Sequence, residues 1–122
     1  MAFNDLREFI AEVDKLGECR TIEGADWETE IGTLSELEGE QPNPRLLLFD
    51  KIGDYPPGYR VVSNLFSTPR RTALALGLPP EDKGVELVQA FKEKLKAGIK
   101  LIPPVEVKTA PVKENVHTGD KV

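Results

Sequence analysis

The stretch RLLLFDKIGDYPPGYRVVSNLF, residues 45–66, contains two strand signals separated by a turn. Its first part, RLLLFDKI, is a short apolar run bounded by Pro44 and Gly53, which is typical of a strand covered on both faces. GDYPPGY has turn composition, and YRVVSNLF is rich in β-branched residues. The stretch therefore predicts two strands of a small sheet.

Two segments upstream of this stretch have helical periodicity. The first lies between a capping-box pair, Asp5 and Glu8, and a stop at Gly17, and predicts an amphipathic helix of about three turns. Its apolar face consists of Leu6, Phe9, Ile10, Val13 and Leu16. The second, DWETEIGTLSELEGE at 26–40, predicts a helix although Gly32 weakens it by about 1 kcal/mol relative to alanine. ECRTIE, residues 18–23, predicts a short strand between them.

The downstream half predicts two more helices and then loses its periodicity. Thr68 is a natural N-cap, Pro69 suits the first helical position, and Gly77 closes a helix over 70–76. Residues 85–95 predict another amphipathic helix. From 103 to 122 no apolar face persists, so this tail is predicted to be a linker or a strand without a partner in the chain. The fold class is therefore α+β (α/β-like), with a small sheet packed against about four helices over 1–102 and an extended C-terminal tail over 103–122.

Composition limits the possible functions. A chain of 122 residues with 39% hydrophobic and 30% charged residues is typical of one globular domain. No apolar run approaches the roughly 18 residues that a membrane span needs, and the N-terminus lacks a signal-peptide layout, so we expect a cytoplasmic protein without membrane contact. Cys19 is the single cysteine, which excludes an intrachain disulfide and favours a packing role.

Charge is distributed unevenly along the chain. Residues 1–40 contain twelve Asp and Glu against three Lys and Arg, a net charge of −9, whereas the remaining residues carry +4. Neither part has a dense basic stripe with interspersed aromatic residues, so the sequence argues against nucleic-acid binding. We expect the opposed charges to help the two parts face each other or another protein.

Asn64, Arg70 and Arg71 are the candidate contact residues, because a helix N-terminus beside two arginines could bind an anion or a neighbouring domain. The same residues are also what a capped helix start requires, and this structural interpretation is favoured. In the first turn of the helix predicted over 70–76, the helix dipole disfavours a positive charge by roughly 0.3 kcal/mol or more. A compensating carboxylate is therefore expected, from the acidic first third or from a domain outside the chain.

No catalytic, cofactor-binding or metal-binding residue is predicted. His117, the single histidine, lies in a predicted loop, and a catalytic dyad there would lack a third partner. The glutamates from Glu28 to Glu40 alternate along an acidic segment, which is typical of a solvated face.

Taken in order, DLREFI, PRLLLFDKIGDYPPGYRVVSNLF and TPRRTALALGL resemble the N-terminal domain of the UbiD family of decarboxylases, and PPVEVKTAPVKENVHTGDKV is similar to the segment that leads into that family's central domain. The resemblance implies a homo-oligomeric parent carboxy-lyase that acts reversibly on aromatic or α,β-unsaturated acids. It implies prenylated FMN, a divalent metal (Mn) and K, held with a Glu-Arg-Glu network by the central domain.

The resemblance thus implies that this chain's partners are the flavin-binding and C-terminal domains and that the chain alone is inactive. Decarboxylation of such acids needs an electron sink that no side chain provides. The alternative is a free-standing, non-catalytic interaction or regulatory module.

Overall fold

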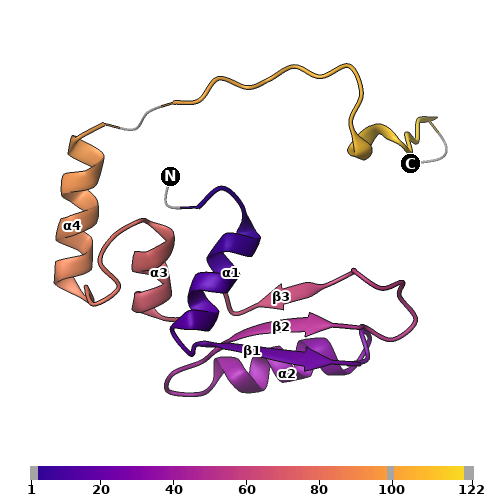
Figure 1. Cartoon of the computed structure of the whole chain (residues 1–122), viewed down its shortest axis with the longest axis horizontal. Coiled ribbons are helices and arrows are strands. Elements are labelled where there is room, and N and C mark those ends of the chain that lie inside the picture. The colour runs from indigo at the N-terminus through magenta and orange to yellow at the C-terminus, as the bar shows by residue number, and fades with distance from the viewer. Residues whose placement is uncertain (1–2, 99–100, 120–122) are drawn as a thin grey trace.

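The computed structural model describes residues 3–98 and 101–119 and has an α+β fold, as predicted (Figure 1). The described ranges contain four α-helices and three strands, followed by a short 3₁₀ turn. The elements are α1 (Leu6–Lys15), β1 (Cys19–Glu23), α2 (Glu30–Gly39), β2 (Leu46–Asp50), β3 (Val61–Ser63), α3 (Pro69–Ala75), α4 (Val85–Lys96) and η1 (Pro111–Lys113).

The sheet has the order β1-β2-β3, with β1 parallel and β3 antiparallel to the central β2. Alternate side chains of β2 enter two separate apolar clusters. Leu46 packs with Phe9 and Val13 of α1. Leu47 and Phe49 pack on the other face against Ala25, Ile52, Ile31 and Leu34. Since the side chains of Leu46, Leu47 and Phe49 are at most 1% exposed, the prediction of a strand covered on both faces is confirmed.

The predicted helix ends are also confirmed. Thr68 Oγ1 accepts a hydrogen bond from the backbone of Arg71 at 3.3 Å, and Pro69 occupies the first turn of α3. Gly17 and Gly77 take left-handed conformations (φ of 73° and 63°) directly after the C-caps of α1 and α3, where residues with a side chain are strained. At α1, Asp5 accepts from the backbone of Glu8 as expected. The reciprocal bond comes from the backbone of Asn4, one residue earlier than a capping box requires.

The strands are shorter than predicted, and two of the boundaries that differ have a clear local cause. The strand predicted over 59–66, β3, ends at Ser63, because Asn64 adopts a left-handed conformation (φ 57°) that interrupts it. The second helix begins at Glu30, because the Asp26 carboxylate accepts from both the backbone and the hydroxyl of Thr29 at 2.8 Å and holds residues 27–29 in a turn. Trp27 therefore lies outside the helix.

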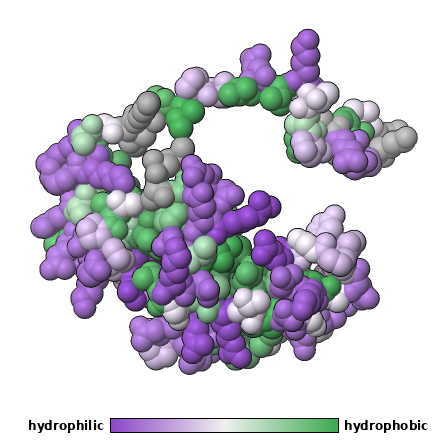
Figure 2. Space-filling view, viewed as in Figure 1, coloured by the Kyte–Doolittle hydropathy of each residue, from purple (hydrophilic) through white to green (hydrophobic). Residues whose placement is uncertain are grey.

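The C-terminal part differs from the rest. No residue of α4 is buried, which is also true of α2, and beyond α4 residues 101–109 are all exposed in an extended segment that runs apart from the helices and the sheet (Figure 1). Figure 2 shows hydrophobic side chains uncovered along this segment. Leu101, Ile102 and Val105 are among its exposed apolar residues. None of the helices in the described ranges is long and apolar enough to cross a membrane. The division at 102/103 stays a prediction.

Candidate functional site

Arg71, one of the three candidate contact residues, is fully buried. Its guanidinium donates through Nε to the carbonyl of Leu65 at 3.0 Å and through Nη2 to the carbonyl of Asn64 at 3.0 Å. Nη1 donates to Oε2 of Glu18 at 2.9 Å. Each nitrogen of this planar group thus has a partner within the chain, which is the arrangement that a buried arginine requires.

Glu18 connects the start of α3 to the end of α1. Its Oε2 also accepts from the Thr68 hydroxyl at 3.4 Å, and its Oε1 accepts from Nη1 of Arg70 at 3.2 Å. Arg70 is more open, with 45% of its side chain exposed. Glu18 is therefore the carboxylate that compensates two positive charges in a helix first turn, and it comes from the acidic first third as expected.

The backbone fixes the position of Glu18. Its N–H donates to the carbonyl of Val13 and so satisfies the end of α1, while its carbonyl accepts from the N–H of Leu46 at the start of β2. Sequence reasoning did not single out Glu18. A need for a carboxylate was visible, but the twelve acidic residues of the first third offered no criterion for choosing among them.

Asn64 joins the same cluster from the end of β3. Its Nδ2 donates to the carbonyl of Ser35 at 2.9 Å, and the hydroxyl of Ser35 donates to that of Ser63 at 2.8 Å. Asn64, Arg70 and Arg71 are therefore brought together, and Arg71 is committed to partners inside the chain. A contact of Arg70 or Asn64 with another domain or an anion remains a prediction.

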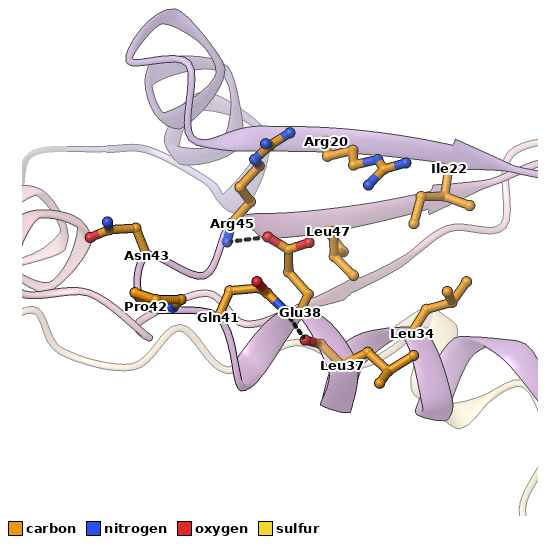
Figure 3. Close-up of a pocket in the computed structure, with 10 residues that line it drawn as sticks. All are labelled: Arg20, Ile22, Leu34, Leu37, Glu38, Gln41, Pro42, Asn43, Arg45 and Leu47. Carbon is orange, nitrogen blue, oxygen red and sulfur yellow. Dashed lines mark hydrogen bonds between the residues drawn. The ribbon is translucent and has the colours of Figure 1, made fainter.

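A separate pocket of about 660 Å³ opens beside β1, between the amino ends of β1 and β2 and the C-terminal half of α2 (Figure 3). Its lining is part apolar, from Ile22, Leu34, Leu37 and Leu47. Arg20 and Arg45 lie along the strand side, and the Glu38 carboxylate accepts from the backbone N–H of Arg45 at 2.9 Å (Figure 3). A lining of this kind suits the docking of a side chain or an amphipathic segment.

Side chains that could bind a metal ion do not gather in the described residues. No group of three His, Cys, Asp or Glu in residues 3–98 and 101–119 is arranged to hold a metal ion. Burial, assisted by the charge of Asp14 and opposed by that of Arg71, raises the pKa of the Cys19 thiol, so the thiol stays protonated at neutral pH, in keeping with a packing role. His117 lies exposed in the C-terminal segment.

Comparison with known proteins gives one family and one set of structures. The family model of the 3-octaprenyl-4-hydroxybenzoate carboxy-lyase N-terminal domain (UbiD) matches residues 10–91. The open form of vanillic acid decarboxylase from Sedimentibacter hydroxybenzoicus is 26% identical, with a TM-score of 0.69, over 93% of this chain and 24% of that chain. The closed form gives 24% identity, a TM-score of 0.67 and the same coverage.

An open form of that enzyme with truncated ShVdcD gives 22% identity and a TM-score of 0.72 over 79% of this chain and 21% of that chain. The truncated open form and the closed form are both less than 25% identical to this chain, so their likeness shows a shared fold alone. The chain spans about a quarter of the length of these decarboxylase chains.

Proposed function

The chain belongs to the UbiD family as its N-terminal domain, and on this premise we propose that it serves a larger reversible (de)carboxylase of aromatic or α,β-unsaturated acids. In this role it packs on a flavin-binding domain and helps to form the cleft, without performing chemistry alone. The observation that carries the proposal is the family match over residues 10–91, within a chain whose fold is shared with vanillic acid decarboxylase.

The cofactors that the family implies do not fit the residues that the structure describes. Prenylated FMN supplies the electron sink for loss of CO2, and its phosphate with a divalent metal and K requires a carboxylate-rich or phosphate-cradling site. The described residues contain no group of side chains arranged to hold a metal ion. The guanidinium of Arg71, which lies at the start of α3, is already hydrogen-bonded within the chain and is not free to bind a phosphate. We therefore assign the cofactors to the parent enzyme's other domains.

The proposed partners are the flavin-binding and C-terminal domains of a cytoplasmic, homo-oligomeric parent. Two features support docking against other domains. The first is the pocket beside β1, and the second is the uncovered C-terminal part, from which α4 contributes no buried residue. Both present apolar surface that a neighbouring domain can cover.

The test combines the gene and the protein. Reading the gene beyond codon 122 should reveal a domain with metal-binding residues and a Glu-Arg-Glu set, whereas a stop codon at that point would favour the free-standing module. The 122-residue chain should show no saturable flavin binding by absorbance and no CO2 release from cinnamate-like or hydroxybenzoate-like acids. Turnover by this chain alone would contradict the assignment of the cofactors.

A further inference from the structure

Three aromatic side chains cluster at the carboxyl ends of the parallel strands β1 and β2. Trp27 meets Tyr55 edge-to-face with ring centroids 6.2 Å apart, and Tyr55 lies 6.0 Å from Tyr59. The three side chains are 49%, 47% and 61% exposed. We call Trp27, Tyr55 and Tyr59 the aromatic tip. Large, half-exposed rings in contact with one another are a common feature of recognition surfaces.

The backbone holds this cluster in place. Ala25 and Ile52, close in sequence to the rings, are buried in the core, and the N–H of Gly53 donates to the carbonyl of Ala25, which ties the 51–60 loop to the segment after β1. The N–H of Tyr55 donates to the carbonyl of Ile52 and forms a turn. Figure 1 shows this loop at the end of the sheet towards which the arrows of β1 and β2 point. The rings are therefore presented on an anchored loop and not on a free end.

The surroundings of the aromatic tip are acidic. The two segments that carry the three rings, residues 23–30 and 50–60, contain six carboxylates and two basic residues, Lys51 and Arg60. Lys51 is already paired with Glu23 at 2.8 Å. Glu28 and Asp54, the neighbours in sequence of Trp27 and Tyr55, make no ion pair or side-chain hydrogen bond within the described residues. A negative potential beside exposed aromatic ring faces favours the binding of a cation. Guanidinium should bind better than ammonium, because its planar group can stack on a ring.

We propose that the aromatic tip, with Glu28 and Asp54, is a docking surface for an arginine-bearing protein surface. This rests on the proposed function in one respect, because it assigns that arginine-bearing surface to the remaining part of the decarboxylase polypeptide. The pocket beside β1 presents Arg20 and Arg45, so we expect it to receive a different, less basic part of the same polypeptide.

The chain contains a single tryptophan, so the emission of Trp27 reports on the aromatic tip without a label. A capped peptide of alternating arginine and glycine is added to the 122-residue chain, and lysine–glycine and glutamate–glycine peptides serve as probes of charge and stacking. The arginine peptide should change Trp27 emission saturably, bind about two- to fivefold more tightly than the lysine peptide, and weaken with added salt. The glutamate peptide should have no effect.

Variants then locate the surface. Tyr59→Ala and Asp54→Asn should each weaken binding of the arginine peptide about two- to fivefold. Glu106→Gln, which removes an exposed carboxylate from the extended segment, should leave it unchanged. Circular dichroism confirms that each variant is folded.

Three outcomes would overturn the proposal. They are an unchanged Trp27 emission, equal binding of the arginine and lysine peptides, and equal weakening by Glu106→Gln and Asp54→Asn. Concentration-dependent self-association that Tyr59→Ala abolishes, measured by sedimentation, would instead assign the aromatic tip to a second copy. Because the peptides replace the partner, failure here leaves the result of reading the gene beyond codon 122 unaffected, and the two proposals fail separately.

Discussion

The body of the chain, residues 3–78, and its C-terminal part, residues 85–119, use similar apolar residues in opposite ways. In the body, Phe9, Leu46 and Phe49 are almost completely buried, and polar contacts such as Glu18–Arg71 join elements that are distant in sequence. In the C-terminal part, Val85, Val88 and Leu101 are between 66% and 85% exposed. This difference shows that a periodic apolar face predicts a helix but does not predict which element, if any, packs against that face.

The largest expected effect tests the polar contacts of the body. Arg71→Ala removes the buried partner of Glu18 Oε2 and of two backbone carbonyls, and should lower the free energy of unfolding by about 3–5 kcal/mol. The matched change in the C-terminal part is Lys94→Ala, which removes the hydrogen bonds from Lys94 Nζ to the carbonyls of Leu76 and Gly77. Because Lys94 is exposed, this should cost less than about 1 kcal/mol. Urea unfolding compares the two, and equal losses would remove the distinction.

A leucine truncation in each part gives the next largest effect. Leu47→Ala should cost on the order of 2–5 kcal/mol, because the side chain is buried in the centre of the sheet. Leu95→Ala in α4 should cost less than about 1 kcal/mol, because the side chain is already 44% exposed. An unchanged melting temperature for Leu47→Ala would refute the description of β2 as a central buried strand.

Two glycines at equivalent helix ends give a smaller effect. Gly77 follows α3 with φ of 63°, and Gly98 follows α4 with φ of 90°. In either place alanine is strained by about 1–2 kcal/mol. Gly77→Ala should lower the midpoint of global unfolding, whereas Gly98→Ala should reduce only helix content by circular dichroism. A matching shift of the unfolding midpoint for both would mean that α4 unfolds together with the body.

The smallest effect depends on pH. Hydrogen bonds from the side chain and backbone of Thr29 hold the pKa of Asp26 below its ordinary value. A lowered pKa in the folded state stabilises the fold above the ordinary pKa and loses this contribution as pH falls through the folded value. Wild type should therefore be slightly more stable than Asp26→Asn at pH 6. The difference should begin to shrink below about pH 4 and disappear only when the pH lies below the lowered pKa of Asp26. A difference in urea midpoint that stays constant down to pH 3 would contradict this.

The sequence predicted those features that depend on local chemistry. The apolar run at 46–49 identified the buried strand, and Thr68, Gly17 and Gly77 marked helix ends because capping needs only neighbouring residues. The left-handed Asn64 and the Asp26 turn moved two boundaries, since each depends on a side-chain or backbone choice that periodicity does not encode.

The candidate site was only partly predictable. Asn64, Arg70 and Arg71 were identified from one helix start, and their need for a carboxylate followed from the helix dipole. The choice of Glu18 depends on strand order and on the path between α1 and β1, which local sequence does not determine. The aromatic tip was missed for the same reason, because Trp27 and Tyr55 meet only when β1 and β2 pair in parallel.

Hydrogen–deuterium exchange of the 122-residue chain, read peptide by peptide, tests most directly whether the body folds by itself while the C-terminal part awaits a partner. The amides of α1, β1, β2 and α3 should be protected to a common level set by global unfolding, and those of α4 and residues 101–119 should exchange orders of magnitude faster. Protection of α4 and residues 101–119 equal to that of β2 would contradict the account.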